Sequence, residues 1–215
     1  MKKKLPSNGL LYLILDKQAA DSLGIDILNL AKELAGSDLD LIQLRAKKID
    51  DFEFLKLAKK LSPLFKKNKK LFIINDRPDL AYLSRASGLH LGNSDIPIKD
   101  AKTLLKKGKI IGKTIHCLKE LKNTDQAAVN YLALGPFFKS KTKTNNRPPL
   151  RKNEIIQITK KTKKVLFAIG GINRYNVGSV LRYGIKNIAV SSAILSSSNP
   201  IYEIKEIKKC LKKAS

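Results

Sequence analysis

The sequence predicts an α/β fold, a single (β/α)8 TIM barrel. Short apolar runs rich in β-branched residues alternate along the chain with segments whose apolar residues recur at helical spacing. Eight strands, each followed by a helix, favour a parallel sheet with crossovers that closes on itself. No Ser/Gly/Pro-rich linker divides the 215 residues, so we expect one domain over 1–215. That is slightly short for this fold, which is typically about 250 residues long, and the loops must be lean.

The predicted strands end at Gly, Pro or polar residues, the usual punctuation of short buried strands. They are 10–15, 39–44, 71–74, 88–91, 110–112, 131–134, 165–169 and 187–190. The alternative is an open, doubly wound sheet. No Gly-x-Gly-x-x-Gly turn follows the first strand, where such folds usually hold a dinucleotide.

Helix boundaries are indicated by a few residues between these strands. Gly36 is expected to end the helix after the first strand, and Pro63 to kink or shorten the next one. Asn173 is the expected N-cap of a later helix that Gly184 terminates in the left-handed conformation. The last helix carries apolar residues at helical spacing over 201–211.

The net charge of +25 raises the question of a nucleic-acid partner. The lysines come in pairs spread along the whole chain, mostly near predicted helix ends, with few aromatic residues among them. We therefore predict no specific nucleic-acid partner. No apolar run is long enough to span a membrane, and two distant cysteines favour a reducing compartment. We expect a cytoplasmic protein and leave its oligomeric state, including a homodimer, open.

Unusual polar residues follow the second strand, in the segment 43–47. Alternation sends Gln43, Arg45 and Lys47 to one side and Leu44 and Ala46 to the other. Carboxyl ends of barrel strands share one face, the mouth, where active sites are built. Cations and an amide facing that mouth are typical of an anion site, although solvated charges at a fraying strand end remain the alternative.

Two carboxylates, Asp76 and Asp95, follow the third and fourth strands. They could hold Mg²⁺, which prefers one or two carboxylates together with waters and phosphate oxygens. The alternative is that Asp76 caps the helix behind Pro78 and that Asp95 caps the one starting near Pro97.

A second anion site is predicted on the opposite side of the mouth. Gly170-Gly171 lets backbone amides approach a phosphate, and Ser191 and Ser192 follow the eighth strand. After the sixth strand, the loop 138–149 adds hydroxyls and lysines, among them Ser140, Thr142 and Lys143. Ordinary turns and a solvated basic loop are the alternatives. His90 and His116 are interpreted as structural, hydrogen-bonded histidines.

In combination, these segments resemble the thiamine phosphate synthase family. Its strand-two Gln-x-Arg-x-Lys corresponds to Gln43, Arg45 and Lys47, and its Ile-Asn-Asp-Arg to residues 74–77. The further matches are His90, Leu91, Gly92 and Asp95; Gly135, Pro136, Phe138, Ser140, Thr142 and Lys143; residues 168–172; and Val190, Ser192, Ala193 and Ile194. They occur in the family's order over nearly the whole chain.

The resemblance implies an enzyme that joins 4-amino-2-methyl-5-hydroxymethylpyrimidine diphosphate to 4-methyl-5-(2-phosphooxyethyl)thiazole, releasing pyrophosphate. It assigns Mg²⁺ to Asp76 and Asp95, and charge neutralisation in catalysis to Arg45, Lys47 and Lys143. The implied pyrimidine diphosphate site is Gln43, Leu44, Arg45, Ala46, Lys47, Asn75, Thr114 and Lys143. The implied thiazole phosphate site is Ser140, Lys141, Thr142, Gly171, Ser191 and Ser192.

The chain departs from the family in the loop 138–149, the lid that is expected to close over the site. Asn146, Arg147, Pro148 and Pro149 stand where the family usually has a Gly, which predicts a stiffer loop. The related thiazole tautomerases typically lack the diphosphate site and carry His in place of the Pro of Gly-Pro, so Pro136 favours the synthase. A tautomerase-like barrel, or one that only binds phosphate, is the alternative function.

Overall fold

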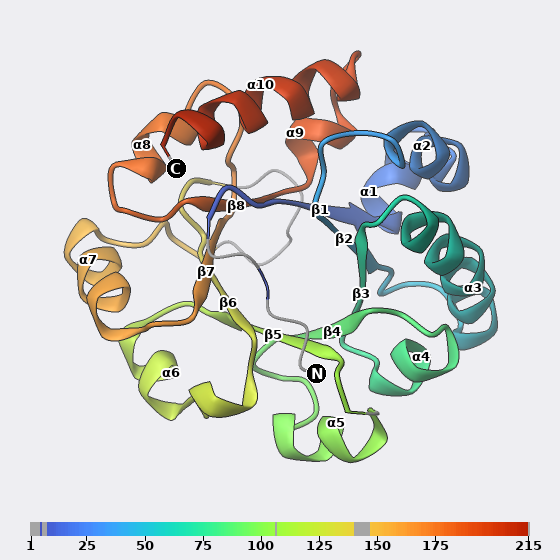
Figure 1. Cartoon of the computed structure of the whole chain (residues 1–215), viewed down its shortest axis with the longest axis horizontal. Helices are drawn as coiled ribbons and strands as arrows, with labels where there is room; N and C mark the ends of the chain where they lie inside the picture. The colour runs from blue at the N-terminus through green and yellow to red at the C-terminus, as the bar shows by residue number, and fades with distance from the viewer. Residues whose placement is uncertain (1–4, 6–7, 106, 140–146, 215) are drawn as a thin grey trace.

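A computed structural model of the chain describes residues 5, 8–105, 107–139 and 147–214. The strands form one closed, all-parallel barrel in sequence order, with β8 pairing to β1 (Figure 1). Their bounds are β1 Leu11–Asp16, β2 Leu41–Arg45, β3 Leu71–Asn75, β4 Gly88–Leu91, β5 Ile110–Ile115, β6 Tyr131–Leu134, β7 Val165–Ile169 and β8 Asn187–Val190. The predicted fold class is confirmed.

The helices lie outside the barrel and cover its strands (Figure 1). They are α1 Lys17–Ser22, α2 Ile27–Leu34, α3 Asp51–Lys67, α4 Pro78–Leu83, α5 Ile98–Leu104, α6 Leu118–Asn123, the 3₁₀ helix η1 Gln126–Ala128, α7 Lys152–Lys161, α8 Val177–Leu181, α9 Ser192–Leu195 and α10 Pro200–Lys213. Within the described part of the chain, none of them is long and apolar enough to cross a membrane.

Strands β4, β6, β7 and β8 have the predicted bounds, whereas β5 continues to Ile115. The prediction that Pro63 kinks or shortens its helix is wrong about length, because α3 runs through it to Lys67. Pro63 and Lys59, whose carbonyl loses its helical partner, are both exposed, so water can satisfy that carbonyl.

One predicted helix boundary is confirmed and another needs correction. Helix α2 ends at Leu34 with Ala35 as its C-cap, directly before Gly36 as expected, although Gly36 does not adopt the left-handed conformation. Asn173 does not cap α8, which begins only at Val177. Its side-chain oxygen instead accepts bonds from the backbone N–H groups of Tyr175 and Asn176, forming a turn ahead of the helix. Gly184 has φ 78° after α8, as predicted.

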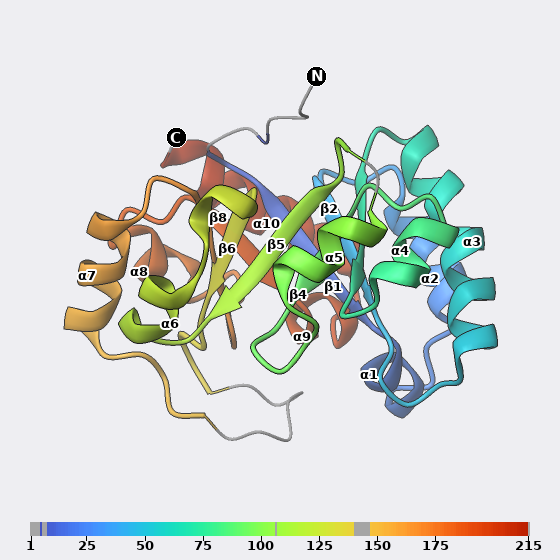
Figure 2. The same ribbon diagram turned by 90° about the horizontal axis from the view of Figure 1, so that it is seen from below.

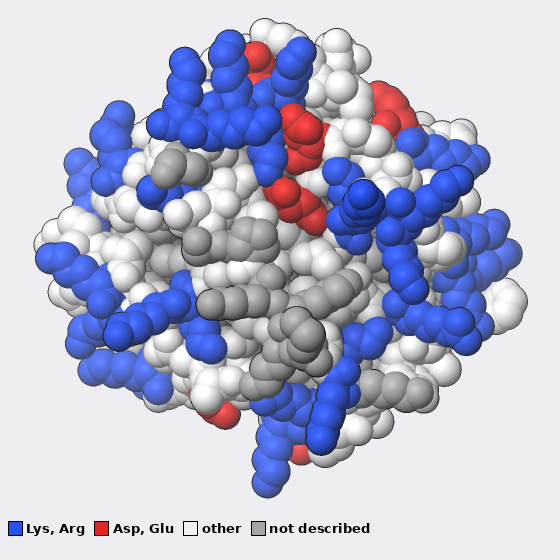
Figure 3. Space-filling view, viewed as in Figure 1, with Lys and Arg blue, Asp and Glu red and all other residues white. Residues whose placement is uncertain are grey.

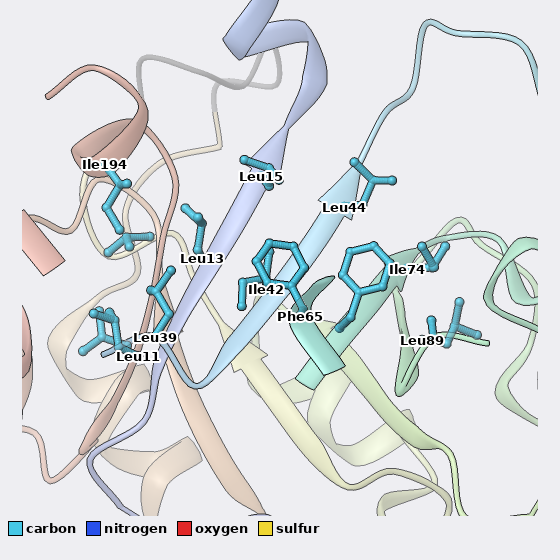
Figure 4. Packing of buried hydrophobic residues seen from close by; sticks show 14 of the residues in the cluster. Leu11, Leu13, Leu15, Leu39, Ile42, Leu44, Phe65, Ile74, Leu89 and Ile194 are labelled. Carbon is cyan, nitrogen blue, oxygen red and sulfur yellow. The ribbon is translucent and has the colours of Figure 1, made fainter. Parts of the chain in front are cut away.

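Alternation along the strands divides the core into two layers. Leu11, Leu13 and Leu15 point outward, where they meet the helices in the larger buried cluster (Figure 4). Tyr12 points inward and packs with the interior residues Tyr131 and Phe167. This interior cluster fills the barrel, so a ligand can enter only at its ends.

The two ends of the barrel differ. The β5 arrow in Figure 2 points away from the end at which α10 finishes, toward the mouth formed by the carboxyl ends of the strands. Figures 1 and 3 look onto the opposite end. There Lys and Arg are spread widely around the rim, with one group over α10 (Figure 3).

Candidate active site

Strand β2 delivers polar groups to the mouth as its alternation predicts. Gln43 is buried, and its amide nitrogen lies 2.5 Å from the Tyr12 hydroxyl inside the barrel. Lys47 Nζ lies 3.1 Å from an Asp76 carboxylate oxygen. Leu44 and Ala46 are buried in the outer layer against the helices. Only the backbone of these two residues can therefore contribute to a ligand site.

Arg45 has a partner that sequence reasoning missed. It forms an ion pair with Asp16, the buried last residue of β1, which also accepts a bond from the Ala19 N–H and caps α1. Asp16 and Arg45 are register partners on neighbouring strands. The sequence signal that could have indicated this pair is Asp16 itself, an acidic residue directly after the apolar run of β1.

Asp76 and Asp95 contact each other at the ends of β3 and β4, sharing a side-chain hydrogen bond. The capping alternative is wrong for both. The N-caps of α4 and α5 are Arg77 and Pro97, and neither helix start receives a side-chain cap. Asp95 instead accepts a bond from the Gly92 N–H, 2.5 Å away.

The backbone and the carboxyl of Asp76 are both in unusual states. Its φ is 64°, a left-handed conformation that costs a non-glycine residue about 1–2 kcal/mol and that concentrates at functional sites. Burial, followed by the contact with Asp95, raises the pKa of Asp76 to about 6. For Asp95, burial is the largest single effect and raises the pKa. The bonds from Asp76 and the Gly92 N–H, together with the charges of Lys47 and Lys113, outweigh it, so the pKa of Asp95 is lowered.

Lys113 on β5 was not singled out from the sequence. Its amine donates a hydrogen bond to the Gly92 carbonyl, beside Asp95, and burial lowers its pKa. Asn75, the buried last residue of β3, faces inward two positions after the interior residue Ile73. Lys47 and Lys113 therefore lie beside the carboxylate pair, and Asn75 brings an amide to the same end of the barrel.

Both histidines have structural partners, as predicted. His90 lies inside the barrel, with Nε2 2.7 Å from the Thr114 hydroxyl and Nδ1 3.0 Å from the Tyr131 hydroxyl. His116 Nδ1 lies 2.6 Å from the Gly135 carbonyl oxygen. Thr114, which belongs to the expected diphosphate site, is therefore held by β4 through His90.

The other side of the mouth is built from backbone and hydroxyls. Gly170 and Gly171 have φ 103° and 65°. A Cβ on Gly171 would lie 2.5 Å from the Lys139 carbonyl oxygen, so the chain after β6 packs directly on this turn. The Ser191 hydroxyl is buried and has no hydrogen-bond partner among the described residues. Ser192 begins α9.

The lid residues Ser140, Lys141, Thr142 and Lys143 lie outside the described residues. The chain on the far side of that segment is anchored to the barrel. Arg147 Nη1 lies 3.6 Å from Glu120 Oε1 and forms an ion pair with it. The Leu150 N–H donates a 2.9 Å hydrogen bond to the Pro136 carbonyl. The two ends of the lid thus meet at Pro136.

Fold and site together define a (β/α)8 barrel whose mouth gathers carboxylates, cations and hydroxyls from several strand ends. Residues 11–194 match the family described as thiamine monophosphate synthase, and the chain belongs to that family. Among curated relatives, thiamine-phosphate synthase of Prochlorococcus marinus is 39% identical over 173 residues, covering 80% of this chain and 50% of that protein.

A relative of similar size is thiamine-phosphate synthase of Fusobacterium nucleatum. It is 34% identical over 189 residues, which cover 88% of this chain and 90% of that protein. The structure of a thiamine phosphate pyrophosphorylase from Pyrococcus furiosus superposes with a TM-score of 0.84 at 27% identity, over 97% of this chain and 98% of that one. By contrast, the chain spans about half the length of the Prochlorococcus relatives.

Proposed function

We propose that this chain is a thiamine phosphate synthase, a transferase of thiamine biosynthesis that joins the pyrimidine diphosphate to the thiazole phosphate and releases pyrophosphate. The observation that carries the proposal is the agreement between two findings. The family match spans β1 to α9, and the polar residues gathered at the mouth occupy the family's motif positions.

The diphosphate is proposed to bind on the β2–β5 side of the mouth. Arg45 and Lys47 supply positive charge there, each held in place by a carboxylate. Asn75 and Thr114 add hydrogen-bonding groups, and the backbone of 43–47 borders the site. Preorganised cations need little rearrangement when negative charge develops, which favours stabilisation of a departing pyrophosphate.

Asp76 and Asp95 fit a Mg²⁺ site by their chemistry. Two carboxyls in contact, one with a raised pKa, form a pair that a cation would stabilise in the doubly ionised state. Since no group of three or more metal-ligating side chains occurs among the described residues, phosphate oxygens and water would complete the shell. When bound, Mg²⁺ would neutralise diphosphate charge.

The chemistry needs no protein nucleophile. The bond between the pyrimidine's exocyclic carbon and the diphosphate oxygen breaks, with the electron pair leaving on pyrophosphate. The electron-rich aminopyrimidine stabilises the carbocation, and the thiazole nitrogen then forms the new C–N bond. Arg45, Lys47 and Lys143 would interact most strongly with the leaving group, whose charge grows in the transition state.

The thiazole phosphate is proposed to bind on the β6–β8 side. The Ser191 hydroxyl, which has no hydrogen-bond partner among the described residues, supports this position, because a buried hydroxyl without a partner costs stability unless a ligand completes it. Gly171 and Ser192 would add backbone or hydroxyl donors. Ser140, Lys141 and Thr142 would come from the lid, whose closure would exclude water from the cation.

A direct assay tests the function. The folded protein is mixed with both phosphorylated substrates and Mg²⁺, and thiamine phosphate and pyrophosphate are quantified. We expect equal amounts of both products, and none when Mg²⁺ is removed with a chelator. If a folded preparation forms no thiamine phosphate, the alternative of a tautomerase-like or phosphate-binding barrel gains support.

Partners and location belong to the same proposal. The partners would be small phosphorylated molecules, and the two free cysteines, Cys117 and Cys210, suit the cytoplasm. Scattered lysines should bind nucleic acid only weakly and without sequence preference, and moderate salt should abolish that binding. Whether the barrel dimerises is open to sedimentation measurements.

A further inference from the structure

A continuous chain of polar side chains crosses the interior of the barrel. It begins at Gln43 on β2, whose amide nitrogen is 2.5 Å from the Tyr12 hydroxyl. The Tyr12 and Tyr131 hydroxyls are 2.8 Å apart, and Tyr131 is 3.0 Å from His90 Nδ1. The chain ends on β5, where His90 Nε2 is 2.7 Å from the Thr114 hydroxyl. Both ends belong to the proposed pyrimidine diphosphate site.

The barrel is built around this chain. Tyr12 and Tyr131 are 1% and 0% exposed and meet edge to face, with ring centroids 5.8 Å apart. The His90 ring stacks on Tyr131 at 5.6 Å. On β5, a Cβ on Gly112 would lie 2.0 Å from the Tyr131 ring, so only glycine leaves room for that ring.

The direction of the hydrogen bonds follows from counting donors and acceptors. Since the Gln43 amide donates to Tyr12, the Tyr12 proton needs another acceptor, and among the described residues Tyr131 provides it. Tyr131 must then donate to His90 Nδ1. A neutral imidazole with Nδ1 as acceptor carries its proton on Nε2, which donates to Thr114.

The other protonation states of His90 leave this count unbalanced. A proton on Nδ1, in the other tautomer or in a doubly protonated ring, makes Tyr131 accept from His90 and donate to Tyr12. Among the residues that the structure describes, the Tyr12 proton would then have no acceptor, while the Gln43 amide donates to the same oxygen. A buried donor without an acceptor costs on the order of 1–3 kcal/mol.

We infer that Tyr12, Tyr131 and His90 form a one-way hydrogen-bond relay, which presents Gln43 as an acceptor and Thr114 as a donor at the mouth. The inference rests on the proposed function. An acceptor on β2 suits the amino group of an aminopyrimidine, and a donor on β5 suits a phosphate oxygen. Tyr131 and His90 are therefore positioning residues, acting on the substrate only through Thr114.

The first test is the tautomer of His90 in the substrate-free protein. The chain has two histidines, so long-range ¹H–¹⁵N NMR of the imidazole rings is simple, and a His116→Gln variant assigns the signals. We expect Nε2 of His90 to carry the proton and Nδ1 to be unprotonated at neutral pH. A proton on Nδ1, alone or in a doubly protonated ring, would overturn the inference.

A matched pair of variants tests the coupling. Tyr131→Phe removes the donor to Nδ1, so the fixed tautomer should be lost and kcat should fall about five- to tenfold, the scale of one neutral hydrogen bond. Tyr12→Phe removes a hydroxyl from the same buried layer but leaves Tyr131 free to donate to His90. The tautomer should then persist, with a raised KM for the pyrimidine diphosphate.

The tautomer of His90 in these two variants distinguishes the relay from simple packing of the tyrosine rings, and it is independent of the test of the proposed function. If both variants, or neither, change the tautomer, the relay is refuted. The tautomer is measured without substrate, so its outcome does not depend on the assay. Absence of thiamine phosphate from the wild-type assay refutes the function alone, whereas full activity with a proton on Nδ1 refutes only the relay.

Discussion

The two sides of the barrel mouth present polar groups in different ways. On the β2–β4 side, cations and carboxylates are paired with one another, as in Arg45 with Asp16 and Lys47 with Asp76. On the β7–β8 side, the glycine turn at Gly170-Gly171 and the Ser191 hydroxyl offer neutral groups. The side chains of the β2–β4 side are held in place by ion pairs, whereas the groups of the β7–β8 side are held in place by the backbone conformation.

This difference suits the two proposed substrates. A diphosphate that departs during the reaction gains charge, which fixed cations stabilise most. A phosphate that only anchors its substrate keeps the same charge throughout, and neutral donors bind it equally in the ground and transition states. The charged side should therefore control kcat, and the backbone side should control KM for the thiazole phosphate.

The largest effect is expected at the carboxylate pair. Asp76→Asn and Asp95→Asn should each lower kcat about 100-fold and raise the Mg²⁺ concentration needed for half-maximal rate, because an amide is a poor substitute for a metal carboxylate. Activity is measured against Mg²⁺ concentration, and circular dichroism is the control for folding. An unchanged Mg²⁺ dependence in both variants would contradict the metal site.

The lid provides the next comparison, predicted from the sequence. Lys143→Ala should lower kcat by roughly 10- to 100-fold with little change in KM for the thiazole phosphate, because its charge would face the leaving group. Thr142→Ala should instead raise that KM. Steady-state kinetics with each substrate varied in turn distinguish them, and identical profiles would defeat the assignment of the two residues to different anions.

A glycine pair tests the role of backbone shape. Gly171→Ala should destabilise the protein by about 1–3 kcal/mol and raise KM for the thiazole phosphate, since φ is 65° and a Cβ would meet the Lys139 carbonyl. In the control, Gly178→Ala, the added Cβ meets nothing within 4 Å and should stabilise α8 by about 0.5–1 kcal/mol. Urea unfolding measures both, and equal effects would refute the constraint at Gly171.

The smallest effect is expected from Ser191→Ala. The hydroxyl has no partner among the described residues, so its loss should leave the free energy of unfolding unchanged or slightly raised. KM for the thiazole phosphate should rise about three- to tenfold through one lost hydrogen bond. A substantial loss of stability without a change in KM would show that the hydroxyl is structural.

The sequence by itself determined the barrel and the position of its mouth. Both depend on local patterns, namely alternation within each strand, helical spacing between strands, and polar residues directly after apolar runs. Because the carboxyl ends of parallel barrel strands lie on one face, the sequence already predicted that Asp76 and Asp95 are close together. The helix start predicted at Asn173 was less predictable, since capping depends on local backbone geometry.

Only the tertiary structure decided how these residues pair. The ion pair of Arg45 with Asp16, and the chain from Tyr12 through Tyr131 to His90, join residues 29 to 119 positions apart. No local pattern encodes such contacts, because strand register and inward direction on several strands must coincide to form them. The same limit explains why the buried tyrosines were not predicted as functional, since from the sequence alone each is one more aromatic core residue.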